Sequence, residues 1–119
     1  MAKMAITVNG AEPKNVYPPF ILGSSAAASG DEVIIFFCPG GAPAMKKGKI
    51  KELNEAAPAL PDLEEMYKGL LSLGGRILVC ELAFDVHDFT QKDLNDEVEV
   101  VGATTFVNEA DDATLTFSF

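Results

Sequence analysis

Short apolar runs recur along the chain, and segments rich in polar or small residues separate them. Five of these runs have the length of a β-strand, at residues 3–8, 32–38, 76–80, 97–101 and 114–119. The second run is apolar at every position from Val33 to Phe37, which is typical of an interior strand with both faces covered. The alternation of such runs with helix-like segments predicts an α/β protein with a buried parallel sheet.

Two longer segments between the strands have helical features. Pro18 and Pro19 suit the first positions of a helix, and Gly30 suits its end, so a helix is predicted over the small-residue run between them. A second helix is predicted from Pro61 to Gly74, because acidic residues follow the proline and apolar residues recur at helical spacing. Shorter helices are predicted at 82–88, 91–95 and 104–110, whereas 39–58 shows little periodicity.

The composition favours one compact domain over residues 1–119. Of these residues 48% are hydrophobic and 23% charged, which is enough apolar material for a core without disulfides, a metal or a cofactor. No apolar run approaches the ~18 residues that span a bilayer, and the first residues alternate like a strand instead of forming a signal sequence. We therefore expect a cytosolic protein with no membrane span.

The charge is acidic and unevenly distributed. Eighteen acidic and nine basic residues give a net charge of −9, which argues against binding to nucleic acid or to an anionic membrane. Residues 81–119 carry the whole net charge, because residues 1–80 hold equal numbers of acidic and basic side chains. The one basic cluster follows the second predicted strand and consists of Lys46, Lys47, Lys49 and Lys51.

The two cysteines, Cys38 and Cys80, are the main candidates for chemistry. Two cysteines are too few for a secreted disulfide scaffold and lack the paired spacing of a zinc site, so we expect free thiols and no metal. Both fall at the carboxyl ends of predicted strands, where parallel sheets bind their ligands. Cys80 also precedes a predicted helix, whose N-terminus favours a thiolate. The alternative is that both thiols simply pack, since free cysteines are often buried.

The other candidate residues each have a plain structural interpretation as well. The lysine cluster would attract an anionic sulfur donor or an acidic partner, or would be an ordinary solvated loop. His87, the only histidine, would pair with a cysteine or be a lone surface imidazole on an acidic segment. Gly40 and Gly41 match neither a dinucleotide-binding nor a P-loop pattern, so nucleotide binding has weak support.

The segment from Gly74 to Ala83, GGRILVCELA, resembles the cysteine segment of the DsrE/DsrF-like family of sulfur-relay proteins. Residues 98–117 resemble the last helix and strand of that family, and residues 30–37 resemble its second strand. The resemblance implies a three-layer α/β/α sandwich with a five-stranded parallel sheet, assembled into homotrimers or homohexamers. It also implies a persulfide-carrying cysteine, which maps onto Cys80, and no metal or organic cofactor.

The resemblance further implies that the second and third strands are neighbours, about 4.8 Å apart. The thiols of Cys38 and Cys80 would then approach disulfide range if their levels match. In that arrangement Cys38 would be a resolving thiol for a persulfide or a sulfenic acid on Cys80.

Three hypotheses follow for the function. The first is a cytosolic, homo-oligomeric sulfur carrier of the sulfurtransferase type, in which Cys80 accepts sulfur from a donor and passes it to a partner's thiol. For it we assign catalytic roles to Cys80 and Cys38 and substrate binding to Gly40, Gly41, Lys46 and Lys47. The second is a non-catalytic oligomeric binding module with packed cysteines, and the third is a redox switch that uses both thiols.

Overall fold

The computed structural model describes residues 1–119 and contains one five-stranded sheet in which every pair of neighbouring strands is parallel. In sheet order the strands are β4 (Glu99–Val101), β3 (Arg76–Cys80), β2 (Glu32–Phe37), β1 (Lys3–Val8) and β5 (Leu115–Ser118). Each apolar run picked out in the sequence contributes one strand. The predicted parallel sheet is confirmed, with β2 ending one residue before Cys38 and β4 beginning two residues later than predicted.

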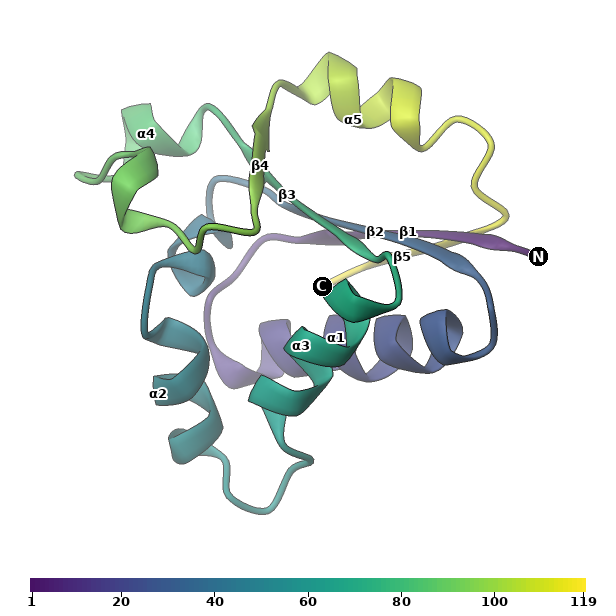
Figure 1. Cartoon of the computed structure of the whole chain (residues 1–119). Helices are drawn as coiled ribbons and strands as arrows, with labels where there is room; N and C mark the ends of the chain where they lie inside the picture. The colour runs from purple at the N-terminus through teal and green to yellow at the C-terminus, as the bar shows by residue number, and fades with distance from the viewer.

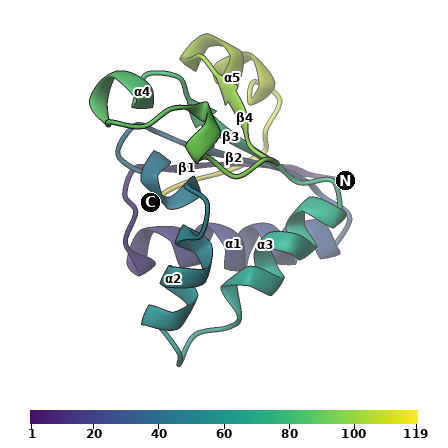
Figure 2. The same cartoon turned by 60° about the vertical axis from the view of Figure 1, so that its left-hand side comes forward.

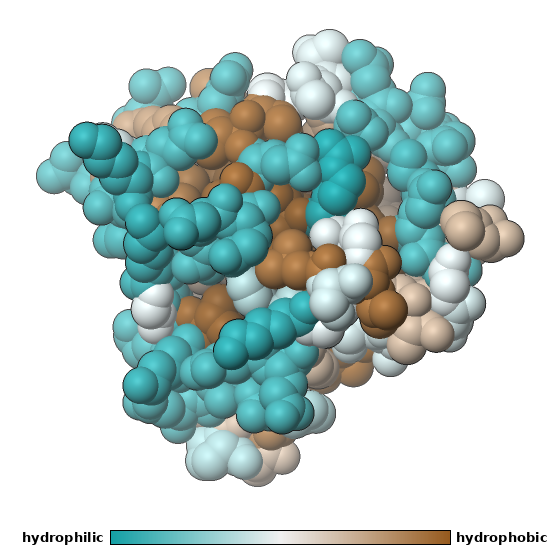
Figure 3. Space-filling view, viewed as in Figure 1, coloured by the Kyte–Doolittle hydropathy of each residue, from teal (hydrophilic) through white to brown (hydrophobic).

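Helices cover both faces of the sheet (Figure 1). One face carries α1 (Pro13–Ala28), α2 (Lys49–Ala56) and α3 (Leu63–Ser72), and the other carries α4 (Ala83–Val86) and α5 (Ala103–Glu109), as the rotated view also shows (Figure 2). Two 3₁₀ turns, Ala42–Met45 and Gln91–Asp93, lie in the loops. The three-layer α/β/α sandwich is thus confirmed. On the face seen in Figure 1, hydrophobic residues reach the surface between hydrophilic residues (Figure 3).

The first helix begins earlier than the sequence suggested. It starts at Pro13, so that Pro18 and Pro19 lie inside it instead of opening it. A proline inside a helix removes a backbone hydrogen bond and costs about 3 kcal/mol or more. The fully buried side chains of Tyr17 and Phe20 flank the two prolines and pack into the core, and this burial offsets the cost.

Helix α2 lies in the stretch 39–58, for which no helix was predicted. Its buried apolar side chains are only Ile50 and Leu53, one turn apart, so the periodic signal is too short to be read from the sequence. Gly48 precedes the helix with φ at 85°, a conformation that glycine adopts without strain. The short helix therefore forms because it packs on the larger core.

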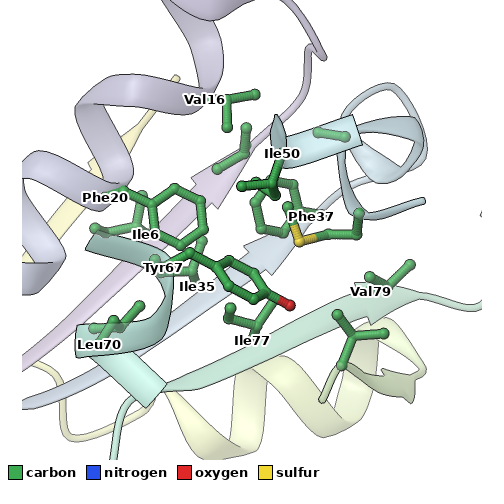
Figure 4. Close-up of a cluster of buried hydrophobic side chains, with 14 of the residues drawn as sticks. Ile6, Val16, Phe20, Ile35, Phe37, Ile50, Tyr67, Leu70, Ile77 and Val79 are labelled. Atoms are coloured by element: carbon green, nitrogen blue, oxygen red, sulfur yellow. The ribbon is translucent and has the colours of Figure 1, made fainter. Parts of the chain in front are cut away.

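The two faces of the sheet bury very different amounts of apolar surface. Between the sheet and α1–α3 lies a cluster of 25 buried residues, in which side chains from β1, β2, β3 and the three helices converge (Figure 4). On the opposite face the cluster has only three buried members, Phe36, Leu78 and Cys80. The layer over this second face is therefore thin, and it covers one of the two cysteines. None of the helices is long and apolar enough to cross a membrane.

Candidate functional site

Cys80 is the last residue of β3 and lies on the thinly covered face of the sheet. It is 3% exposed. Alternate residues of a strand face the same side, so Cys80 shares this face with Leu78, and Phe36 on β2 completes the buried cluster. The predicted strand end is confirmed, but the thiol is closed off from solvent.

Cys38 directly follows β2 and lies beside Cys80. The register of β2 on β3 pairs Phe37 with Val79, so continuing it by one residue brings Cys38 opposite Cys80. Cys38 is half-buried and packs against the cluster that contains Cys80. Its backbone N–H donates to the carbonyl oxygen of Val8 at 2.9 Å, which fixes its height relative to the sheet. The two thiols are free, and the two cysteines lie opposite each other on neighbouring strands.

An aromatic pair covers the cysteines. Phe106 of α5 stacks on Phe36 of β2, with ring centroids 4.4 Å apart and ring planes within 9°. Phe106 and Val101 are the partly buried residues that join Cys38 around this small cluster. Sequence reasoning missed this contact, because the two rings lie seventy residues apart and neither is part of a chemical motif. The only available signal was that both segments resemble the same family.

The ionisation of Cys38 is shifted by its surroundings. Burial raises the pKa of its thiol, and the nearby charge of Cys80 raises it further, against a smaller opposite effect from a backbone hydrogen bond. Desolvation disfavours the thiolate, and a second negative charge repels it. At neutral pH Cys38 is therefore held as a thiol, and the effect of Cys80 on it reflects how close the two side chains are.

Gly40 and Gly41 allow the loop after β2 to lie against the end of β1. The N–H of Gly40 donates to Oδ1 of Asn9 at 3.1 Å, and the N–H of Gly41 donates to the carbonyl oxygen of Cys38 at 2.8 Å. A Cβ on Gly41 would lie 2.4 Å from the carbonyl oxygen of Val8. Both amides therefore make internal bonds, and the glycines hold the Cys38 loop close to the sheet.

The lysine cluster lies around the start of α2, and most of its charges have partners. The ammonium group of Lys46 lies 5.6 Å from the centroid of the Phe89 ring, a cation–π contact. Nζ of Lys47 donates to the carbonyl oxygen of Lys92 at 2.9 Å and lies 3.5 Å from Asp96. A surface cavity of about 320 Å³ is lined by Pro43, Lys46, Lys47, Lys49 and Glu52.

His87 joins the two loops that follow the cysteines. Its Nε2–H donates to the carbonyl oxygen of Pro39 at 2.6 Å, and its ring stacks on Phe89 with centroids 5.5 Å apart. The half-buried imidazole is thus a structural link, not the lone surface group that the acidic segment suggested. Further backbone bonds, from Lys47 to Asp93 and from Asn95 to Met45, tie the same two loops together.

None of the surface cavities is lined by Cys38 or Cys80. No group of three or more histidine, cysteine and carboxylate side chains is arranged to hold a metal ion. The chemistry that the arrangement can support is thiol chemistry between two neighbouring cysteines, one closed and one partly open. The candidate substrate-binding residues lie in the segment between β2 and α2, and they do not form a common pocket with the two cysteines.

Comparison with protein families matches residues 2–119 to the model of the DsrE/DsrF-like family. Two curated relatives are similar to the chain. One is the uncharacterized protein MJ0760 of Methanocaldococcus jannaschii, which is 29% identical over 102 residues. That match covers 86% of this chain and 36% of the relative, so the chain spans about a third of that protein's length. The other is the sulfur carrier protein DsrE2 of Allochromatium vinosum, 27% identical with 95% of each chain covered.

Two solved structures share the fold. The ychN protein from E. coli superposes with a TM-score of 0.77 at 17% identity and full coverage of both chains. The protein MTH1491 from Methanobacterium thermoautotrophicum superposes with a TM-score of 0.72 at 10% identity, covering 98% of this chain and 97% of that one. At these identities the likeness concerns the arrangement of helices and strands.

Proposed function

We propose that this chain, which belongs to the DsrE/DsrF-like family, is a sulfur carrier that holds persulfide sulfur on Cys80. Membership of the family and the similarity to a sulfur carrier protein support a role in sulfur relay. The observation that carries the assignment to Cys80 is its position, at the carboxyl end of β3 beside a second free thiol. Parallel sheets bind and react at that end.

The transfer conserves sulfur and electrons. The thiolate of Cys80 attacks the outer sulfur of a donor persulfide, a new S–S bond forms, and the donor leaves as a thiolate. An acceptor thiolate then attacks the outer sulfur on Cys80, and Cys80 is released as a thiolate. Thiosulfate also serves as a donor, in which case sulfite is the leaving group. Cys38, Gly40, Gly41, Lys46 and Lys47 belong to this proposal as the assisting thiol and as substrate-binding residues.

The test is to incubate the protein with thiosulfate or polysulfide and to measure intact and peptide masses without reductant. We expect one additional sulfur on the Cys80 peptide, which added thiol removes. Cys80→Ser should lose that addition and keep the fold, as checked by circular dichroism. Extra sulfur in the wild type that never appears on the Cys80 peptide would overturn the assignment.

Burial favours a second candidate, a binding module whose cysteines only pack. Cys80 is 3% exposed and no cavity reaches it. This candidate predicts that Cys80 in the native protein is alkylated at neutral pH no faster than an ordinary buried thiol. Rapid alkylation, or sulfur loading, would exclude it.

The matched levels of Cys38 and Cys80 favour a third candidate, a two-cysteine redox switch. Neighbouring parallel strands are about 4.8 Å apart, within the usual Cα range of a disulfide. Mild peroxide should then produce an intramolecular disulfide, seen as a loss of two mass units and of both free thiols. Two separate, unchanged thiols would exclude the switch.

The proposal includes assembly into a homo-oligomer, a trimer or a hexamer. Apolar side chains that a monomer leaves exposed support it, among them Val107 on α5 and Leu115 and Phe117 on β5. A sulfur donor and a sulfur acceptor are the other partners, and the cytosolic location expected from the sequence belongs to the same proposal.

A further inference from the structure

The two thiols differ in how far solvent and partners reach them. Cys80 is 3% exposed and enclosed by Phe36, Leu78 and the α5 layer. Cys38 is half-buried and stands at the start of the loop that follows β2. A thiol reacts with a donor only where the donor's sulfur reaches it along the S–S axis. A donor approaching the closed molecule therefore meets Cys38 first.

The same geometry makes exchange between the two cysteines easy. Cys38 continues the strand that pairs in register with β3, and it packs against the cluster that holds Cys80. Holding two reacting groups at this spacing turns a bimolecular exchange into an intramolecular one and raises its rate strongly. The neighbouring loop is also held firmly, because Cys38 bonds to Val8 and Pro39 accepts a hydrogen bond from His87.

We propose that sulfur enters through Cys38 and is then stored on Cys80, an order of events that rests on the proposed sulfur-carrier function. In the first step the Cys38 thiol loses its proton to water, the resulting thiolate attacks the outer sulfur of the donor persulfide, and the donor leaves as a thiolate. In the second step the Cys80 thiolate attacks the outer sulfur on Cys38. One S–S bond forms and one breaks in each step, so nothing is oxidised or reduced overall.

Storage on Cys80 protects the sulfur. The walls around it are apolar and come from Phe36, Leu78, Val101 and Phe106, so a small thiol in solution removes the outer sulfur only slowly, after that sulfur has returned to Cys38. Delivery to an acceptor runs through Cys38 in the reverse order. The competing reaction is attack at the inner sulfur, which would join Cys38 to Cys80 as a disulfide and release hydrosulfide.

Glutathione persulfide is a suitable probe, because it is larger than the inorganic donors and depends more strongly on access. Samples are quenched with excess iodoacetamide at successive times, and the Cys38 and Cys80 peptides are weighed. In the wild type we expect the extra sulfur on Cys38 first and on Cys80 later. Cys38→Ser should lower the loading rate of Cys80 at least tenfold, and Cys38→Ala should do the same.

Two controls separate the loss of the entry thiol from damage to the fold. Circular dichroism and thermal unfolding report on the fold of both Cys38 variants. The rate at which iodoacetamide alkylates Cys80 should match the wild type, because neither variant removes the α5 layer. In Cys80→Ser the sulfur should stay on Cys38 and be lost to added glutathione faster than it is lost from the wild type.

The outcomes that oppose the proposal are distinct. Loading of Cys80 at the wild-type rate in both Cys38 variants would overturn entry through Cys38 and leave the carrier function standing. A Cys38–Cys80 disulfide with stoichiometric release of hydrosulfide would overturn storage and favour the redox switch. A wild-type protein that never gains sulfur on either cysteine would overturn this inference together with the proposed function.

Discussion

At the scale of single residues, the Cys38 thiol is shifted toward its protonated form by burial and by the charge of Cys80. Both influences act on the thiolate and not on the neutral thiol, so both raise the pKa. Only the second depends on another titratable side chain. A substitution at Cys80 therefore separates the two causes, and it does so without changing the backbone that holds Cys38.

We expect the pH dependence of Cys38 alkylation to give a pKa above that of an ordinary thiol. In the Cys80→Ser protein we expect the pKa of Cys38 to be lower. Removing the neighbouring charge leaves only burial to oppose the thiolate. The measurement is the rate of iodoacetamide modification of the Cys38 peptide as a function of pH in both proteins. Identical pH profiles would show that the two thiols do not interact.

Gly41 supports the site through its lack of a side chain. Because a Cβ there would lie 2.4 Å from the carbonyl oxygen of Val8, Gly41→Ala forces two backbone segments apart. We expect it to lower the free energy of unfolding by about 1–3 kcal/mol, measured by urea denaturation. Gly69→Ala is the matched control, since no atom lies within 4 Å of its added Cβ. In the interior of α3 that change should stabilise by roughly 0.5–1 kcal/mol.

At the scale of elements, α5 packs over the cluster that contains Cys80 while burying none of its own residues fully. Its contacts with the rest of the molecule are few. Phe106 stacks on Phe36, and Glu109 pairs at 3.1 Å with Arg76, whose guanidinium also makes two bonds to Glu99. The hydrogen bonds from Arg76 lower the pKa of the Glu99 carboxyl group. A helix held by one aromatic contact and a partly exposed ion pair opens more readily than one packed on a large core.

Phe106→Ala should therefore increase the alkylation rate of Cys80. An aromatic pair contributes roughly 0.5–1.5 kcal/mol beyond burial, so its loss shifts the opening of α5 by up to about tenfold. Val107→Ala is the control, because Val107 lies on the same helix and is 62% exposed. Equal rates in the wild type and the Phe106→Ala protein would show that another element closes the site.

The sequence predicted the sheet well because a buried strand needs only a short apolar run, such as Val33–Phe37. It failed at the start of α1, where Pro13 and not Pro18 opens the helix, since tertiary burial outweighs the local cost of proline. Strand ends also located both cysteines at the same edge. Their covering by Phe106 was not predictable, because it depends on packing between segments distant in the chain. The hydrogen bonds that Gly40 and His87 make within the chain were not predicted for the same reason.

At the scale of the whole molecule, the uneven charge is partly compensated within the fold. The lysine cluster lies beside the acidic segment 81–119, where Nζ of Lys47 lies 3.5 Å from Asp96 and the backbone N–H of Lys47 donates to the carbonyl oxygen of Asp93. The cluster is therefore less free to attract an external anion than its sequence alone suggests. The fold also leaves apolar surface uncovered. The edge strand β5 is exposed at every residue and has a neighbouring strand on one side only.

An exposed edge strand with apolar side chains favours association with a second copy. Leu115 and Phe117 on β5 are 39% and 37% exposed, and contacts between identical subunits close into symmetric assemblies. We expect light scattering to give a mass that is a multiple of 12.7 kDa. Phe117→Lys should reduce it toward the monomer, because a charge at this position must be desolvated on association.

The matched control is Leu73→Lys, which puts the same charge at the end of α3 on a side chain that is 57% exposed. It should leave the measured mass unchanged, because α3 packs on β3, which β2 and β1 separate from β5 in the sheet. Dissociation by both variants would show that the subunit contact is not specific to β5. A wild type that scatters as a monomer would contradict assembly altogether. In a monomer Cys80 would be shielded by α5 alone. The Phe106→Ala experiment would then be the decisive measure of access to Cys80.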